Sequence, residues 1–141
     1  MKSITRAPGA FLLAVLLACG PVLAAECDPS KAGAKISYAE KIQPIFGGIC
    51  AQCHNTMETP EGLVLEAGLA LDLLVDVRSV QSALKRVEPG YPEKSYLVHK
   101  LRGTQDSVGG SGQQMPAGLA PLRDEEIDLV VQWIKACSPV N

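Results

Sequence analysis

Five consecutive residues, Cys50-Ala51-Gln52-Cys53-His54, constrain this chain more than any other feature. The pattern C-x-x-C-H is typical of covalent haem attachment. Two thiols add to the two vinyl groups of the porphyrin, and the two-residue spacer places both sulfurs on one turn of backbone. The imidazole that follows then reaches the iron. We therefore predict one haem c, bound covalently through Cys50 and Cys53, with His54 as the proximal iron ligand.

Other interpretations of the motif require features that this sequence does not offer. A thioredoxin-like C-x-x-C belongs to a βαβ unit, and no segment here alternates well enough to predict a strand. A structural zinc site needs a fourth ligand, normally from a second paired motif, and the chain has none. A surface histidine beside a chance C-x-x-C is the remaining alternative.

The start of the chain has the pattern of a secretory signal. Lys2 and Arg6 precede an apolar run over residues 10–18, Gly20-Pro21 follows as a helix breaker, and Val22-Leu23-Ala24 offers small residues for cleavage after Ala24. The apolar run is too short to span a bilayer. We expect the protein to be exported to the periplasm.

The same segment holds a second cleavage pattern. Leu16-Leu17-Ala18-Cys19 resembles a bacterial lipobox, in which Cys19 becomes a lipid-anchored N-terminus. A membrane-anchored lipoprotein is therefore the alternative to a free periplasmic protein. With cleavage after Ala24, the chain divides into a signal peptide (1–24), an N-terminal arm (25–36) and one domain (37–141).

The cysteines outside the motif and the leader form one further pair, Cys27 and Cys137. An exported protein reaches an oxidising compartment, where disulfides persist, so we predict a Cys27–Cys137 disulfide. It would close a loop of 110 residues (137 − 27). By restricting the unfolded chain, such a disulfide would stabilise the folded state by about 4–5 kcal/mol in the chain-entropy model. Two unpaired thiols are the alternative, because the sequence does not say that the two residues meet.

Helical periodicity dominates the exported part of the chain. Ser37-Tyr38-Ala39-Glu40 matches a capping box and predicts a helix leading into the haem motif, with a kink or restart at Pro44. Pro92 opens another helix, which runs to Arg102 before Gly103. A short helix is expected within residues 71–84. The last helix is the clearest, because its apolar residues recur with helical spacing: Ile127, Val130, Val131 and Ile134.

The sixth iron ligand must be Met, His or an exogenous molecule. Met57 follows His54 by only three residues and stays on its side of the porphyrin. Met115 lies in a Gly-rich loop over residues 103–121, and its thioether could approach the opposite face. The alternative role for a lone methionine is to fill a gap in the core.

His99 is the rival ligand and would give bis-histidine ligation. It lies two positions after Leu97, which is about 200° around a helix. This phase turns His99 away from the apolar side formed by Leu97 and Leu101. A solvated histidine is therefore the better interpretation, and Met115 is the preferred sixth ligand.

These motifs resemble class I mono-haem cytochrome c domains, and more narrowly the planctomycete-type and related bacterial cytochrome c domains. The similarity covers roughly residues 37–136. It implies an all-α fold of orthogonal helices around one covalently attached haem, with His54 and Met115 as axial ligands and electron transport rather than enzymatic catalysis. The segments that carry it are CAQCH, Val87-Glu88-Pro89-Gly90-Tyr91-Pro92, Ser95-Tyr96-Leu97, Lys100-Leu101, Met115-Pro116 and Trp133-Ile134.

The partners expected on this basis are redox proteins of the periplasm. No basic run or aromatic–basic interleaving points to nucleic acid, and the sequence leaves the oligomeric state open. A haem-based small-ligand sensor and a dedicated redox subunit of a periplasmic oxidoreductase are the alternative functions.

Two further sets of residues are expected near the haem. Lys100 or Arg102 could neutralise a haem propionate. The candidate pocket residues are Ile45, Phe46, Leu97, Leu101 and Pro116, although a plain core role is the commoner one for each of them.

Overall fold

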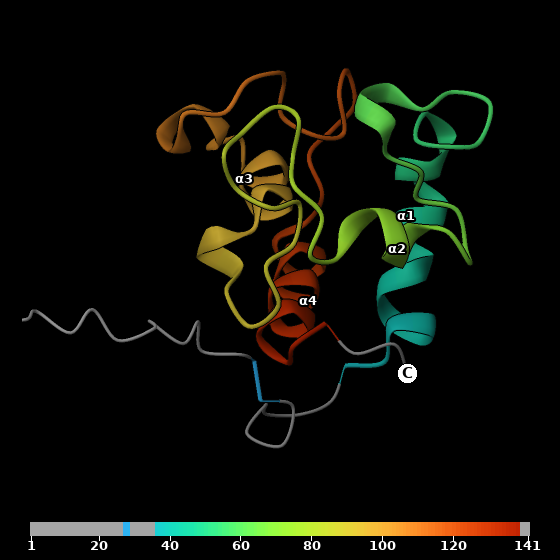
Figure 1. The fold of residues 1–141 in the computed structure, drawn as a ribbon. Helices are drawn as coiled ribbons and strands as arrows, with labels where there is room; N and C mark the ends of the chain where they lie inside the picture. Colours follow the sequence, from blue (N-terminus) through green and yellow to red (C-terminus); the bar gives the residue numbers. More distant parts are fainter. Residues whose placement is uncertain (1–26, 29–35, 139–141) are drawn as a thin grey trace, which may run out of the picture.

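The computed structural model describes residues 27–28 and 36–138 (Figure 1). The expected signal peptide, the Cys19 lipobox and most of the N-terminal arm lie outside these residues. In the described part the regular elements are helices, and β-type contacts are limited to isolated bridges such as that between Val75 and Val87. Across the same residues, no helix has the length and apolar character needed to cross a membrane. The all-α class predicted from the sequence agrees with this architecture.

The domain begins with a helix that changes type along its length. Tyr38–Ile42 form a π-helical turn (η1), and Gln43–Gly48 continue as α1. The Ser37 hydroxyl accepts a hydrogen bond from the N–H of Glu40 at 3.3 Å, as the capping pattern predicts. Pro44 falls in the first turn of α1, where its missing N–H breaks no helical hydrogen bond. The restart expected at Pro44 is therefore the change from π- to α-helical winding.

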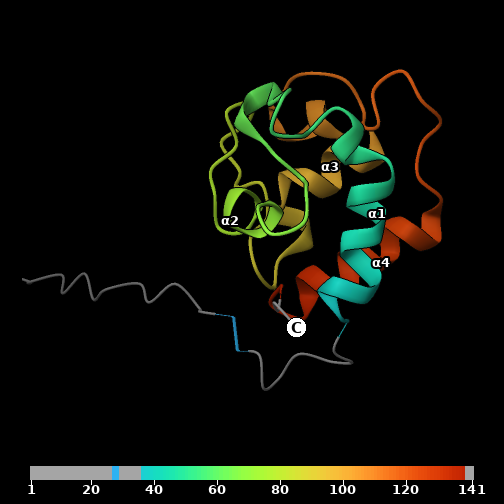
Figure 2. The ribbon, with the colours of Figure 1, turned by 90° about the vertical axis from the view of Figure 1, so that its right-hand side faces the viewer.

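The last helix supplies the centre of the core. α4 (Asp124–Lys135) begins where the N–H of Arg123 donates to the carboxylate of Glu126 at 3.1 Å. Its apolar face is buried as the spacing predicts, and Trp133 on that face is fully buried. The Trp133 ring lies 5.4 Å from the ring of Tyr38 in η1. The first and last helices therefore pack together, and α1 crosses α4 in Figure 2.

The helix predicted from Pro92 onward is two elements. Pro92–Lys94 form a 3-10 turn (η4), and α3 covers Tyr96–Arg102. The break lies at Ser95, which is fully buried and extended. Its hydroxyl accepts from the N–H of Glu88 and donates to the carbonyl of Tyr91, both at 2.9 Å. These bonds to the preceding turn hold Ser95 out of a continuous helix.

The middle of the chain is mostly loop with short helical pieces. α2 covers Ala70–Leu74, at the start of the region where the sequence predicts a short helix. The rest of that region consists of turns and bends, with isolated bridges from Val75 to Val87 and from Arg78 to Lys85. Three further 3-10 turns are η2 (Cys50–Gln52), η3 (Pro60–Gly62) and η5 (Gln105–Val108).

The two ends of the described chain meet at a disulfide. Cys27 and Cys137 are joined, with their Cα atoms 5.7 Å apart, so the structure contains the predicted pair. Gly90 packs directly on it, since a Cβ atom at Gly90 would lie 2.6 Å from the sulfur of Cys27. The N–H of Gly90 also donates to the carbonyl of Ile134 at 2.7 Å. The disulfide, the turn at Gly90 and the end of α4 therefore form one packed corner.

Candidate functional site

The C-x-x-C-H motif forms a tight turn directly after α1. The N–H groups of Cys53 and His54 both donate to the carbonyl of Cys50, at 3.2 and 2.8 Å. Neither Cys50 nor Cys53 takes part in a disulfide. Cys50 is half-buried, and burial raises the pKa of its thiol to about 11, whereas Cys53 is exposed. The turn therefore presents two uncrosslinked cysteines together with an imidazole.

Asn55 ties this turn together, a role that the sequence patterns did not identify. Its side-chain N–H₂ donates to the carbonyls of Ala51 and Gln52, both at 3.1 Å. Its side-chain oxygen accepts from the N–H groups of Met57 and Glu58, at 2.9 and 2.8 Å. Asparagine is a residue that commonly bonds to nearby backbone in turns. That preference is the sequence signal that could have marked Asn55.

The imidazole of His54 is held in one orientation. Its Nδ1 lies 3.2 Å from the carbonyl oxygen of Leu63, so Nδ1–H donates and Nε2 keeps a free lone pair. Metal-binding histidines characteristically have such an outer partner. Burial lowers the pKa of His54, and the positive charges of Arg86 and Lys100 lower it further, although the bond to Leu63 acts in the opposite direction. The neutral ring needed for metal binding is therefore favoured.

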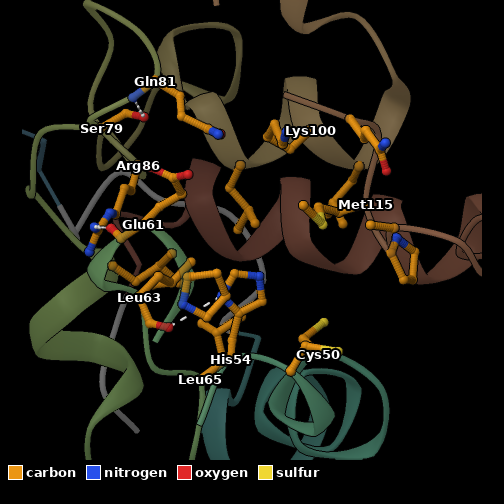
Figure 3. A pocket seen from close by; sticks show the side chains of 18 of the residues that line it. Cys50, His54, Glu61, Leu63, Leu65, Ser79, Gln81, Arg86, Lys100 and Met115 are labelled. Carbon is orange, nitrogen blue, oxygen red and sulfur yellow. Dashed lines mark hydrogen bonds between the residues drawn. The ribbon is translucent and has the colours of Figure 1, made fainter. Parts of the chain in front are cut away.

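A cavity of about 350 Å³ opens in front of His54. In Figure 3, His54 and Cys50 lie on its lower wall, and Met115 and Lys100 lie on its upper wall. The structure thus brings Met115 to the same cavity as His54, although the two residues are 61 positions apart (115 − 54). Much of the lining is apolar: Leu63, Leu65, Leu74, Leu97, Leu101 and Pro116.

Two of the predicted pocket residues are not part of this lining. Leu97, Leu101 and Pro116 line the cavity, whereas Ile45 and Phe46 do not. Phe46 is fully buried in the hydrophobic core, in an edge contact with Tyr38. Ile45 packs against the hydrophobic core. The helical phase of α1 directs both side chains into the protein interior instead of the cavity.

Met115 is held by main-chain contacts to α3. Its N–H donates to the carbonyl of Lys100 at 2.8 Å. The side-chain amide of the neighbouring Gln114 donates to the carbonyl of Leu101 at 3.0 Å. The long loop before α4 is therefore fastened to the end of α3 at the point where Met115 reaches the cavity.

The competing histidine lies outside the cavity. Nδ1 of His99 is 3.0 Å from the hydroxyl of Thr104, and Nε2 is 3.1 Å from the carbonyl of Glu93. His99 is not among the lining residues, as its helical phase predicted. Met57 is also outside, with 94% of its surface exposed.

Two buried cations face the cavity, and the sequence patterns pointed to only one of them. Lys100 is 6% exposed and Arg86 is 9% exposed, and both line the cavity. Arg102, the other predicted propionate partner, points away and forms an exposed ion pair with Asp128 at 3.6 Å. Burial lowers the pKa of both Lys100 and Arg86. The lining of the cavity is therefore largely apolar, with these two cations and the carboxylate of Glu61 as its charged groups.

No model of a known protein family, no curated protein and no solved structure matches this chain. Among the described residues, no group of three or more His, Cys, Asp and Glu side chains is arranged to hold a metal ion. The donors around the cavity are those that a covalently attached haem requires. They are two unpaired thiols, an imidazole with a free Nε2 and a thioether on the opposite wall.

Proposed function

We propose that this chain is an exported class I c-type cytochrome that carries single electrons through one covalently bound haem. The observation that carries the proposal is the cavity itself. It gathers Cys50, Cys53 and His54 on one wall and Met115 on the other, within a largely apolar lining. The proposed export rests on the signal pattern of residues 1–24.

Each group of the site has a defined part in this proposal. A haem bound here supplies a one-electron iron couple. Cys50 and Cys53 would hold it through thioethers, and His54 and Met115 would both bind its iron, which would leave no coordination position open. The apolar side chains exclude water from the iron. These properties suit electron transfer with little structural change.

Lys100 suits a haem propionate. Its ammonium group is buried and donates a long hydrogen bond, 3.4 Å, to the carbonyl of Ser111. A buried charge is costly unless it is paired. A carboxylate from the bound haem would satisfy it, and Arg102 is too far outside the cavity to do so.

Covalent haem attachment is the first test. The full chain is expressed in a bacterium that attaches haem in its periplasm, and the intact mass of the product is measured. We expect one haem, and a variant with Cys50→Ser and Cys53→Ser should lose it. The matched control replaces the other pair, Cys27→Ser and Cys137→Ser, and should keep the haem. A wild-type product without covalent haem would overturn the proposed function.

The same mass measurement decides between the two expected forms of the N-terminus. Cleavage after Ala24 gives a free periplasmic protein, whereas lipidation at Cys19 keeps residues 19–24 and adds the mass of the lipid. The ligand-sensor alternative needs a different experiment, because a sensor differs from an electron carrier in whether Met115 stays on the iron.

Replacing Met115 tests the electron-carrier assignment. The ferric wild-type protein should show the weak near-infrared band of methionine–iron ligation, and Met115→Ala should lose it and bind carbon monoxide when reduced. His99→Ala should leave the band unchanged, because His99 lies outside the cavity. If the reduced wild-type protein itself binds carbon monoxide readily, a ligand sensor is the better assignment.

A further inference from the structure

Arg86 connects three separate segments beside the candidate site. Its guanidinium donates to the main-chain carbonyls of Leu73 (2.6 Å), Glu61 (2.6 Å) and Gly62 (3.2 Å). Its own main-chain groups bind Val77 and Leu97, at 2.7 and 2.9 Å. In the part of the chain that the structure describes, the hydrogen-bond acceptors of its guanidinium are all backbone carbonyl oxygens, with no carboxylate among them.

The turn that Arg86 holds has an unfavourable backbone conformation. Glu61 and Gly62 are consecutive residues with positive φ angles, 56° and 64°. A left-handed conformation is costly for a non-glycine residue such as Glu61 and persists where surrounding contacts enforce it. The rigid fork of a buried guanidinium is suited to this task, because it binds two successive carbonyls at once.

The residue after this turn is the partner of the candidate iron ligand. Leu63 follows Gly62 directly, and its carbonyl accepts the Nδ1–H of His54. The backbone position of Leu63 therefore depends on the turn that Arg86 fastens. Figure 3 shows Arg86, Glu61 and Leu63 along one edge of the cavity, leading down to His54.

We propose that Arg86 is a positioning residue for His54. Its guanidinium holds the Glu61-Gly62 turn, so that the Leu63 carbonyl stays fixed as acceptor for His54 Nδ1–H and sets the orientation and basicity of the ring. The inference rests on the proposed function, since it concerns how His54 binds the haem iron. It assigns Arg86 a part different from that of Lys100, whose ammonium group has donors left for an anion.

The test compares Arg86→Lys with wild type in the haem-loaded protein. Lysine keeps the positive charge but lacks the fork that reaches the three carbonyls. In the reduced, diamagnetic state we expect the His54 Nδ1 proton to exchange with solvent about tenfold faster, which corresponds to about 1.4 kcal/mol. We also expect a higher midpoint potential, because a weaker bond at Nδ1 makes the imidazole a less basic ligand that stabilises ferric iron less.

Arg102→Lys is the matched control. Arg102 has the same side chain at an exposed site on α3, where it meets Asp128 and not the turn. Its variant should leave both the exchange rate and the potential unchanged. The inference is overturned if Arg86→Lys behaves like Arg102→Lys, or if the amides of α4 exchange faster by the same factor, which would indicate general loosening of the fold.

A measurement on the wild-type protein covers the case in which Arg86→Lys does not accumulate. Three carbonyl bonds should slow rotation of the Arg86 guanidinium, so its Nη protons should give separate nuclear magnetic resonance signals, unlike those of Arg102. Averaged Arg86 signals would overturn the inference. Failure of the proposed function is recognised separately, because the wild-type protein would then carry no covalent haem.

Discussion

Two buried cations near the cavity differ in what their side chains already bind. Arg86 uses its guanidinium on three main-chain carbonyls. Lys100 has its long bond to Ser111 and a distant contact with the ring of Tyr96, 6.0 Å from the ring centre. Arg86 and Lys100 are therefore buried to a similar extent but have different roles. Arg86 belongs to the framework around His54, and Lys100 is the cation that we assign to a propionate.

Gly90 packs so closely against the disulfide that a side chain at this position should destabilise the fold. Its φ angle is +85°, and a Cβ atom there would lie 2.6 Å from the sulfur of Cys27. We predict that Gly90→Ala lowers the free energy of unfolding by about 2–4 kcal/mol, because backbone strain adds to overpacking. Chemical denaturation of the haem-loaded protein measures this loss.

Gly68 offers the matched control for Gly90. Its φ angle is +86°, but a Cβ atom added at Gly68 would have no neighbouring atom within 4 Å. Gly68→Ala should therefore carry only the backbone strain, about 1 kcal/mol. Equal losses in the two alanine variants would contradict the proposed packing of Gly90 against the disulfide.

Local residue patterns predicted Cys50, Cys53, His54 and Met115 as site residues, and the structure brings all of them to one cavity. Arg86 could not be predicted in this way. Its acceptors are backbone carbonyls 13 to 25 positions away, and every residue type offers a backbone carbonyl. Only the folded arrangement identifies its partners.

At the scale of elements, the contact between η1 and α4 makes the fold sensitive to alkaline pH. Tyr38 is buried against Trp133, and burial raises its pKa from 10.0 to about 12. The folded state favours the neutral phenol. The contribution of the buried phenol to the free energy of unfolding is therefore complete below pH 10 and is lost as the pH rises toward 12. At pH 11 the loss should be about 1 kcal/mol.

Tyr38→Phe tests this contribution. The variant removes the titrating hydroxyl and its bond to the side-chain oxygen of Gln43 at 2.7 Å. Unfolding free energies of wild type and variant are compared at pH 8 and pH 11. The wild-type protein should lose about 1 kcal/mol more than the variant over this range. The same loss in both proteins would show that another group is responsible.

Helices with strong periodicity were predictable, and breaks set by tertiary contacts were not. The apolar spacing of α4 indicates both its extent and its buried face. Gly103 ends α3 in the left-handed conformation (φ 69°), as expected for a glycine after a helix. The predicted start of α3 is too early, because the bonds that hold Ser95 extended come from its side chain and the preceding turn. Ile45 and Phe46 take the core role that the sequence favoured for them over a pocket role, because closeness in sequence to the haem motif does not fix which side of α1 a residue faces.

At the scale of the whole molecule, the disulfide joins the two ends of the described chain. Cys27 and Cys137 are 110 positions apart, so the bridge restricts the unfolded chain over most of its length. We predict that Cys27→Ser with Cys137→Ser lowers the free energy of unfolding by about 2–5 kcal/mol. Neither residue lines the cavity, so the visible spectrum of the haem-loaded protein should stay the same.

Thermal and chemical unfolding of this double variant provide the measurement. Reduction of the wild-type disulfide under native conditions serves as the control and should give a similar loss. An unfolding free energy equal to that of the oxidised wild-type protein would contradict the prediction. A changed visible spectrum would show that the corner around Gly90 affects the site after all.

The loop that carries Met115 is hydrogen-bonded to the C-terminal end of α3, so the wall of the cavity at Met115 and the end of this helix depend on each other. A helix leaves its last carbonyls without partners in its own backbone. Here the carbonyls of Lys100 and Leu101 are satisfied by the N–H of Met115 and the side chain of Gln114. The loop thus serves as the C-terminal cap of α3. A movement of the backbone that carries Met115 away from the cavity would also uncap this helix, so the folding energy of α3 helps to keep the backbone of Met115 beside the cavity.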